Sequence, residues 1–333
     1  SSVPKNPDGT LVYNNSLSPS GLMDGISALL THNGHRNEDQ IHEFAPSFEA
    51  IIKPIKGLDF RANYSFIHYN YQNMNRGVNV PYSKYPGEIS YITTGVGLNR
   101  LYESQTNHWY KAFNAYGTYE HSIKEKHNFK IMAGYNYETK FLKDLKMERQ
   151  GLLTDILDDF DLAKGDVMSI AGGKNRYALM GTFYRFNYDY KGKYLFETSG
   201  RYDGSSRFQK DDRWGFFPSF SAGWRLDEEA FFQPLKPIIN SFKIRASYGS
   251  LGNQQVGYYD YIQTINTGGT DGTLNYTFTD GIKAPSATET APNASNLTWE
   301  KVSTANLGVD VELLKQRLSL TADVYVRDTK DML

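Results

Sequence analysis

The 333-residue sequence contains no cysteine, which excludes disulfides, thiolate metal ligands and a cysteine nucleophile. It has no run of the ~18 to 20 apolar residues that a membrane-spanning helix needs, and its apolar residues show almost no helical periodicity. Its 36 basic and 37 acidic residues leave a formal net charge of -1, so charge indicates no nucleic-acid partner. These absences leave an all-β chain that is either soluble or crosses a membrane with strands.

Aromatic residues and period-two alternation are abundant instead. Tyr (25) and Phe (19) supply most of the 14% aromatic content, although the mean hydropathy is polar at -0.56. In residues 241–248, Phe242, Ile244, Ala246 and Tyr248 alternate with polar residues, as in a half-buried strand. The same pattern predicts ten strands, most of them about 9 to 13 residues long, at 43–53, 58–70, 108–120, 127–139, 176–189, 193–203, 214–226, 241–248, 305–312 and 318–326.

Short and long connections alternate between these strands. The short ones lie at 53–57, 121–127, 190–193, 227–240 and 313–317, and the long ones at 71–107, 140–175, 204–213 and 251–298. An antiparallel meander with all its long loops at one end is typical of an outer-membrane barrel. A tilted crossing needs ~9 to 11 residues, whereas strands of soluble proteins average ~5 or 6. The sequence therefore predicts a transmembrane antiparallel β-barrel with short periplasmic turns and long extracellular loops.

Aromatic side chains are expected at both interfaces of the lipid-facing surface. Tyr194 and Tyr202 share one face of a predicted strand, and at ~3.3 Å per residue they lie roughly 26 Å apart, about the height of an apolar band. Trp214 and Trp224 bracket the next strand in the same way. We therefore interpret the aromatic residues of 201–225 as girdle and band, and not as a core or a binding site.

The opposite faces carry charges of both signs, which an ordinary β-core could not bury. The charged residues and asparagines of these faces are Glu49, Arg61, Asn63, Lys130, Glu138, Arg185, Asn187, Glu197, Arg201, Arg225, Lys243, Arg245, Asp310, Asp323 and Arg327. This pattern indicates a hydrated lumen or a surface that holds a polar plug. Most of these charges are expected to pair with each other or with a plug, and the sequence assigns none of them to substrate.

No catalytic residue, cofactor site or metal site is predicted. The motifs G-x-x-x-x-G-K-[ST], G-x-S-x-G and H-E-x-x-H are absent. A cation site is conceivable in "HNGH" (32–35) with His42, or in the acidic segment 153–166, but a solvated loop is the preferred interpretation of both. The acidic segment contains Asp155, Asp158, Asp159, Asp161 and Asp166. Residues 258–278 fit a sugar-stacking surface and a protruding strand extension equally well.

Three segments resemble a known family. They are residues 181–232, which include "RWGFFPSFSAGWRLDEEAFF", residues 239–261, which begin "INSFKIRASYGSLGN", and residues 296–333, which include "NLGVDVELLKQRLSLTADVYV". In order and spacing they strongly resemble the barrel of SusC/RagA-type TonB-linked transporters, and residues 43–140 fit the same barrel more loosely.

The resemblance implies a 22-strand barrel around an N-terminal plug, with outer-membrane lipid around it. It further implies a SusD-like surface lipoprotein over the mouth and import of a glycan or peptide, driven through the TonB complex by the proton gradient. The location implied is the outer membrane of a Gram-negative, Bacteroidetes-type cell. Residues 1–333 are then expected to be a partial barrel domain with strands between 43 and 328 and no plug segment. Because open sheet edges are prohibitive in lipid, the remaining strands must be supplied elsewhere.

The sequence thus predicts the barrel part of a TonB-dependent nutrient importer that is not an enzyme. Its loops at 71–107, 140–175 and 251–298 are expected to form the mouth that meets substrate and lid protein. Two alternatives stay open, namely a structural or adhesive surface β-protein and a passive porin.

Overall fold

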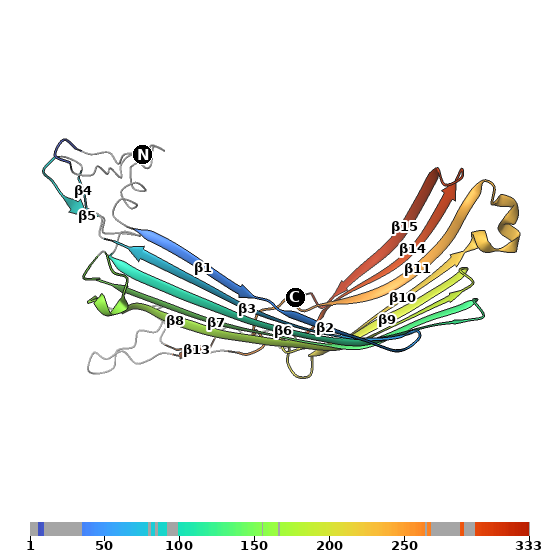
Figure 1. The fold of residues 1–333 in the computed structure, drawn as a ribbon, viewed down its shortest axis with the longest axis horizontal. Coiled ribbons are helices and arrows are strands. Elements are labelled where there is room, and N and C mark those ends of the chain that lie inside the picture. Colours follow the sequence, from blue (N-terminus) through green and yellow to red (C-terminus); the bar gives the residue numbers. More distant parts are fainter. Residues whose placement is uncertain are drawn as a thin grey trace. The chain divides into compact units, whose positions relative to one another are not determined.

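The structure is a computed structural model. It describes residues 6–9, 35–78, 81–83, 86–91, 99–154, 156–165, 167–263, 265–267, 287–289 and 297–332. Within these residues, no helix is both long enough and apolar enough to cross a membrane. The described chain is instead dominated by long antiparallel strands (Figure 1).

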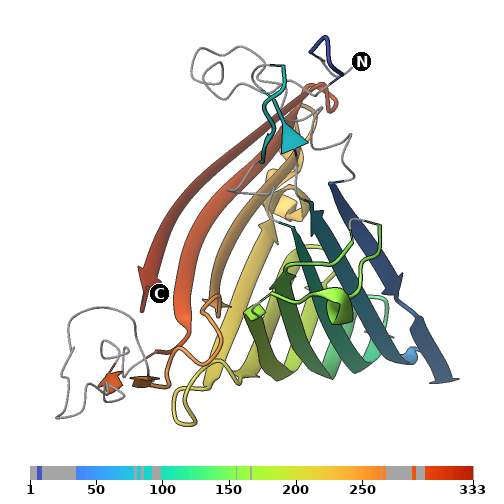
Figure 2. The ribbon, with the colours of Figure 1, turned by 90° about the vertical axis from the view of Figure 1, so that its left-hand side faces the viewer.

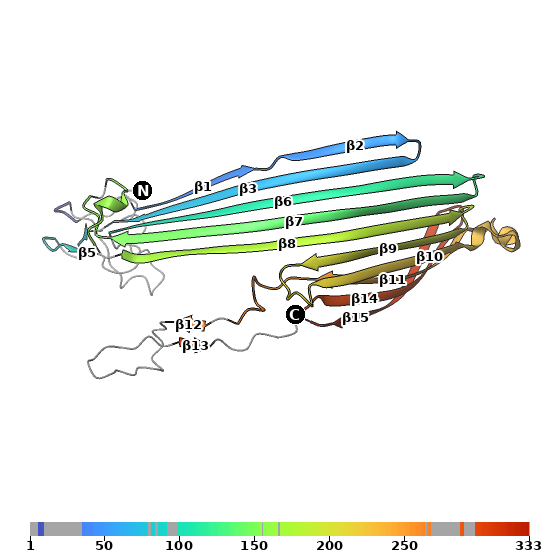
Figure 3. The same cartoon turned by 90° about the horizontal axis from the view of Figure 1, so that it is seen from below.

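Eleven strands form one sheet in the order β1-β3-β6-β7-β8-β9-β10-β11-β14-β15, with β2 also paired to β3. Their bounds are β1 Arg36–Phe44, β2 Ser47–Ile55, β3 Leu58–Gly77, β6 Arg100–Ile123, β7 His127–Gln150, β8 Val167–Tyr190, β9 Tyr194–Ser205, β10 Trp214–Arg225, β11 Ile239–Asn253, β14 Glu300–Leu313 and β15 Leu318–Lys330. Two small sheets pair β4 (Pro81–Tyr82) with β5 (Ser90–Tyr91) and β12 (Ile265–Thr267) with β13 (Ala287–Glu289). All ten predicted strands are confirmed, and the meander follows chain order (Figure 3).

The first predicted strand is interrupted. β1 and β2 pair with β3 in one continuous register, since Phe44 lies opposite His68 and Ser47 opposite Ser65. Pro46 falls between the two segments, and its missing N–H is tolerated because this strand has a partner on only one side in the described sheet. Its carbonyl still accepts a hydrogen bond from the Phe66 amide at 3.1 Å.

Several strands are much longer than predicted. β3 has 20 residues, and β6, β7 and β8 have 24 each, so much of the predicted loops 71–107 and 140–175 is strand. At ~3.3 Å per residue such strands exceed the ~30 Å of hydrocarbon more than twofold. The extensions carry polar residues on both faces, so apolar alternation gives no signal there, while the backbone ladder still holds them.

The chain divides into two compact units, which are described separately. Unit 1 comprises Ser1–Ala45, Ile67–Tyr110 and Phe141–Asn175, and unit 2 comprises Pro46–Phe66, Lys111–Lys140 and Arg176–Leu333. Unit 1 therefore contains β1 and the long-loop ends of β3, β6, β7 and β8. Unit 2 contains the other parts of those four strands together with β2 and β9–β15. Figure 2 shows β10, β11, β14 and β15 running side by side in unit 2, from yellow to dark red.

The register in unit 2 separates two chemically different faces. Residues that lie opposite one another form rows across β10, β11, β14 and β15. On the apolar face the rows are Phe220–Tyr248–Ala305–Val326, Ala222–Ala246–Leu307–Val324 and Trp224–Ile244–Val309–Ala322. On the polar face they are Ser221–Ser247–Asn306–Tyr325, Gly223–Arg245–Gly308–Asp323 and Arg225–Lys243–Asp310–Thr321. Side chains of the apolar face are open, with Leu307 57% and Val324 75% exposed. So large an open apolar surface is suited to lipid and unsuited to water.

The predicted pairs of interfacial aromatics also share the apolar face. Tyr194 stacks on Trp224 at 6.4 Å between ring centroids, and Tyr202 stacks on Trp214 at 5.0 Å. These two pairs lie at opposite ends of the β9–β10 ladder, with Phe196 and Phe220 between them. The ladder therefore carries two aromatic ends and an apolar middle.

Glycine is required at one of the short turns. Gly57, between β2 and β3, has φ +86°, and a Cβ there would lie 2.4 Å from the backbone oxygen of Glu120 in β6. The Gly57 carbonyl accepts a hydrogen bond from the Glu120 amide at 2.8 Å. Close approach and positive φ together exclude a side chain at this position.

We predict that Gly57→Ala destabilises the full-length protein by more than the ~1 to 3 kcal/mol that positive φ alone costs. Gly87→Ala is the matched control, because Gly87 has φ +87° but open space where the Cβ would lie. The measurement is the temperature at which the folded band converts to the unfolded band on a denaturing gel. Equal shifts for both variants would show that the contact with Glu120 is unimportant.

Candidate functional site

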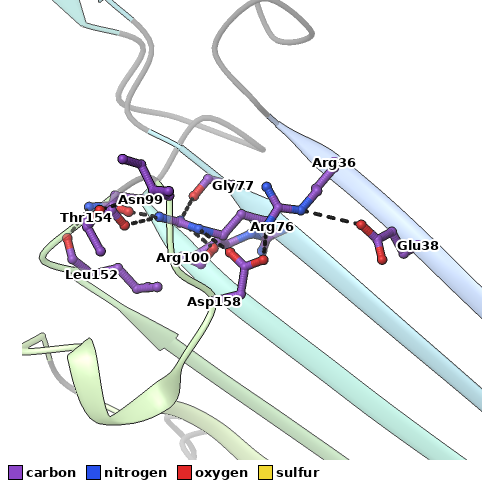
Figure 4. Close-up of polar contacts among 10 residues, drawn as sticks. Arg36, Glu38, Arg76, Gly77, Asn99, Arg100, Leu152, Thr154 and Asp158 are labelled. Atoms are coloured by element: carbon purple, nitrogen blue, oxygen red, sulfur yellow. Dashed lines mark hydrogen bonds and ion pairs between the residues drawn. The ribbon is translucent and has the colours of Figure 1, made fainter.

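The long-loop end of unit 1 is held by a buried arginine. Arg76, at the end of β3, has no exposed surface, and its Nη1 donates to the Asn99 side chain at 2.9 Å and to the Arg100 carbonyl at 3.1 Å. Its Nη2 donates to the Thr154 carbonyl at 2.9 Å. Figure 4 shows the guanidinium at the centre of these contacts, which also include the Gly77 carbonyl. One side chain thus joins the end of β3, the start of β6 and the loop after β7.

The charge of Arg76 is neutralised by Asp158. The Arg76 Nε lies 3.2 Å from Asp158 Oδ1, and Arg36 of β1 pairs with the same carboxylate. The side chain of Asp158 is only 18% exposed. A buried cation persists only when it is paired and hydrogen-bonded, so this carboxylate is a structural requirement of the loop.

A small apolar cluster fixes the same loop. Leu101, Leu152 and Ala163 are buried together, and Met74 and Phe160 pack against them. The loop contains the short 3₁₀ helix η3 (Phe160–Leu162), which begins after Asp159, whose side chain accepts a hydrogen bond from the Asp161 amide at 2.9 Å. The described residues 151–154 and 156–165 are therefore held to the end of the sheet at Leu152, Phe160 and Ala163.

Neither conceivable cation site is assembled by the described residues. Asp158 is bound to two arginines and Asp159 caps η3, while Asp155, Asp166 and residues 32–34 lie outside the described residues. The pKa of His35 is lowered by burial and then by Arg100 and Arg76, so its surroundings disfavour a cation. No three His, Asp or Glu residues of the described chain converge to hold a metal ion.

The long-loop end of unit 2 is held by a second arginine. The Arg207 guanidinium lies over the Tyr177 ring at 4.7 Å and over the Tyr258 ring at 5.0 Å, and it donates to the Val256 carbonyl. It thereby joins the loop after β9 to β8 and to the loop after β11. Tyr258 belongs to the segment for which sugar stacking and strand extension were both considered. Here its ring contacts Arg207, and most of residues 264–296 lie outside the described residues.

Phe208, which follows Arg207 in the chain, belongs to a buried aromatic cluster. Phe208, Phe217 and Trp299 are 0%, 6% and 3% exposed, and the Trp299 ring contacts both phenylalanines at 5.4 and 5.2 Å between centroids. The Trp299 Nε1 donates to the Arg213 carbonyl at 2.8 Å. The interpretation of every aromatic residue in 201–225 as girdle or band is therefore wrong for Phe208 and Phe217. They are core residues because the loop folds over them.

The predicted polar face of unit 2 holds a network of ion pairs. Arg245 lies 3.1 Å from Asp310 and 2.8 Å from Asp323, and Arg185 lies 3.1 Å from Glu197. Further pairs are Arg61–Asp59, Lys130–Glu120, Arg201–Asp203 and Arg225–Asp227. The expectation that these charges pair with each other is confirmed for these residues. Such a network keeps the face hydrophilic without a net excess of either sign.

Sequence analysis did not single out Arg36, Arg76, Asn99 or Arg207. These residues lie at strand ends or in loops, where apolar alternation gives no signal, and their partners can lie far away in the chain, as with Arg76 and Thr154. The available signal was composition, since the acidic segment 153–166 and arginines near strand ends, such as Arg36 and Arg76, are candidate partners in ion pairs.

An antiparallel sheet with one apolar and one paired-charge face, aromatic ends and long loops at one end defines an outer-membrane β-barrel protein. Residues 6–333 match the family described as "TonB dependent receptor-like, beta-barrel". The chain belongs to this family, and it lies in the outer membrane.

Similar proteins agree with this assignment. The chain is 33% identical over 231 residues to the TonB-dependent receptor SusC of Bacteroides thetaiotaomicron, covering 67% of this chain and 22% of that protein. It is 29% identical over 283 residues to the TonB-dependent receptor P39 of Formosa agariphila, covering 85% of this chain and 25% of that protein. The solved RagAB peptide transporter matches with a TM-score of 0.75 and 25% identity, over 91% of this chain and 32% of that chain. The chain therefore spans about a third or less of these relatives.

We predict that Asp158→Asn releases residues 151–165 from the end of unit 1. Removing one partner of a buried pair costs ~3 to 5 kcal/mol, because the other charge is left uncompensated, and here the buried Arg76 loses its anion while Arg36 keeps Glu38. Amide hydrogen exchange of residues 151–165 in the full-length protein should accelerate. Asp161→Asn is the matched control, because Asp161 is an exposed carboxylate of the same loop. Unchanged protection in Asp158→Asn would contradict the assignment.

We predict that Phe208→Ala loosens the loops after β9 and β11 together. Truncating a buried phenylalanine costs ~3 to 5 kcal/mol, and both loops pack on this cluster. Limited proteolysis should then cut residues 206–213 and 254–263 in the variant and spare them in the parent. Lys210→Ala, at an exposed position of the same loop, should behave like the parent. Cleavage confined to one loop would show that Phe208 does not couple them.

Proposed function

We propose that this chain forms part of the barrel wall of a TonB-dependent importer of the SusC/RagA type, which takes up a peptide or an oligosaccharide. The observation that carries the proposal is the match of residues 6–333 to the receptor barrel family. Residues 1–333 supply wall strands of a 22-strand barrel, and the plug on which TonB acts comes from other residues of the whole protein. The chain has no catalytic role in this proposal.

The chemistry of the two faces supports a wall element. The apolar face is exposed and bracketed by aromatic pairs, as lipid requires. The opposite face carries ion pairs such as Arg245 with Asp310 and Asp323, which suit a surface that a polar plug contacts and leaves. The described sheet ends at β1 and β2, which both pair with β3, and at β15, so each edge needs a further strand in lipid.

The long-loop end supports contact with a substrate and with a lid. In unit 1 Arg76 fixes the described part of the loop after β7, and in unit 2 Arg207 fixes the loop after β9 to residues 256 and 258, so each unit presents a formed surface at its own long-loop end. A preformed surface binds with a smaller entropic cost than a mobile one. We propose that a SusD-like surface lipoprotein covers this end, and the peptide substrate of RagAB and the relationship to SusC make peptides and oligosaccharides the substrate classes to test.

The test is uptake of a labelled peptide pool and a labelled oligosaccharide pool by cells that make the full-length protein. We expect uptake of one pool to be lost when an uncoupler dissipates the proton gradient and when TonB is deleted. Cells that make a general porin instead are the control, and their uptake should survive both treatments.

Uptake that survives both treatments in the test cells would establish the passive porin and overturn the proposal. Uptake of neither pool, with attachment to a surface in its place, would establish the adhesive alternative. A protein recovered without detergent and lacking heat-modifiable migration on a denaturing gel would exclude a barrel altogether.

A further inference from the structure

The connection between β10 and β11 differs from the other short turns. It contains two 3₁₀ helices, η4 (Leu226–Glu228) and η5 (Ala230–Leu235), where sequence analysis predicted a short connection at 227–240. In Figure 3 it is the coiled gold segment beyond the ends of β10 and β11. The short-turn end of an outer-membrane barrel faces the periplasm.

Glu229 ties the start of η5 to the apolar face of the sheet. Its Oε1 accepts hydrogen bonds from the Tyr194 hydroxyl at 2.7 Å and from the Trp224 Nε1 at 3.2 Å, and its Oε2 accepts one from Lys193 at 3.4 Å. The Tyr194 hydrogen bond is the largest cause that lowers the pKa of Glu229, followed by that of Trp224. The carboxylate is therefore ionised at neutral pH and accepts hydrogen bonds from both rings of the Tyr194–Trp224 pair.

Phe232 ties the middle of η5 to the same face. It is 5% exposed and stacks on Phe242 of β11 at 5.8 Å between ring centroids, with an interplanar angle of 24°. Phe242 lies opposite Val311 and two residues from Ile244, on the apolar face. Asp227, 1% exposed, accepts a hydrogen bond from the Phe242 amide at 3.3 Å and pairs with Arg225 at 2.9 Å. Glu229 and Phe232 thus fix the segment to the lipid-facing side of the sheet at its periplasmic end, while Asp227 ties its start to Arg225 of the polar face.

Although Glu229 and Phe232 contact the sheet, three large apolar side chains of the segment remain exposed. Phe231, Leu235 and Ile238 are 65%, 47% and 62% exposed. Lys236 of the segment pairs with Glu228 at 3.5 Å. In water this arrangement exposes apolar area at a cost of roughly 25 cal/mol per Å². At a membrane interface, burial of the same side chains among the lipids is favourable.

We propose that η5 and Ile238 form an interfacial membrane anchor, in which Phe231, Leu235 and Ile238 enter the periplasmic leaflet of the outer membrane. Lipid is the occupant that the geometry favours, because Glu229 and Phe232 attach the segment to rings of the lipid-facing side and its large apolar side chains are open. The paired Lys236 and Glu228, with Glu229, supply the polar rim expected of such an element. The anchor fixes the depth at which the Tyr194–Trp224 pair sits.

The test uses the full-length protein in vesicles of phosphatidylethanolamine and phosphatidylglycerol. Phe231→Cys carries an environment-sensitive fluorophore, and any cysteines outside this cysteine-free chain are replaced. Phe231 is exposed, so the substitution removes no packing. Two matched positions are labelled in the same way. Leu307→Cys reports the apolar face, and Glu125→Cys reports the short turn between β6 and β7, which has no anchor of this kind.

We expect the Phe231 label to be quenched several-fold more by a nitroxide near the lipid headgroup than by one at the acyl-chain end. It should also be several-fold less sensitive to aqueous iodide than the Glu125 label. Adding Phe232→Ala to Phe231→Cys removes the stack on Phe242 and should shift the label toward the iodide response of Glu125.

Two results would overturn the anchor. If the Phe231 label responds to iodide as the Glu125 label does, the segment lies in water. If it is protected from both lipid nitroxides and iodide, another protein or a second copy covers it. Lipid quenching of the Leu307 label in either case would show that the barrel assignment stands and that only the anchor has failed.

Discussion

The hydrogen-bonding requirement of the backbone in lipid is the constraint on which the rest of the structure depends. No water is present in the hydrocarbon to satisfy an unpaired N–H or C=O, so each strand there must pair along its length on both sides. In the eleven-stranded sheet, the strands from β3 to β14 follow chain order and each has a neighbour on either side. Once pairing is fixed, side-chain alternation divides the residues between two solvents. The rows Ala222–Ala246–Leu307–Val324 and Gly223–Arg245–Gly308–Asp323 show that division on adjacent residues.

Outside the hydrocarbon the constraint relaxes, and a different problem appears. Strands that continue beyond the band, and the loops that join them, have little apolar area with which to pack. Here the chain uses arginines that satisfy several loop carbonyls at once, as Arg76 does for Arg100 and Thr154. At the short-turn end, Glu229 has the equivalent role for Tyr194 and Trp224. Charged groups thus hold the connections, while apolar and aromatic groups face the lipid or fill small clusters.

The sequence was sufficient to predict the strands and the assignment of their faces. Period-two alternation is a local property, so the face on which Phe242, Ile244 and Ala246 lie can be predicted without knowledge of the partner strand. Strand ends were mispredicted at the long-loop side, where residues such as Asn70, Gln72 and Asn73 are polar on both faces and no alternation marks the ladder.

The sites at the loop ends were not predictable in the same way. Arg76 with Asp158, and Phe208 with Trp299, are separated by more than 80 residues, and only the folded sheet brings their strands together. Phe208 was assigned to the membrane band because aromatic composition cannot distinguish a ring in lipid from one under a loop. Pairing distant residues requires the register, which a single sequence does not contain.

The central claim is that one face of the sheet contacts lipid and the other does not. The most direct measurement is lipid-nitroxide quenching of single fluorophores placed along β11 of the full-length protein in bilayers, at each residue from 243 to 248. The account predicts quenching at Ile244, Ala246 and Tyr248 and its absence at Lys243, Arg245 and Ser247. Quenching without this alternation, or at none of the six positions, would contradict it.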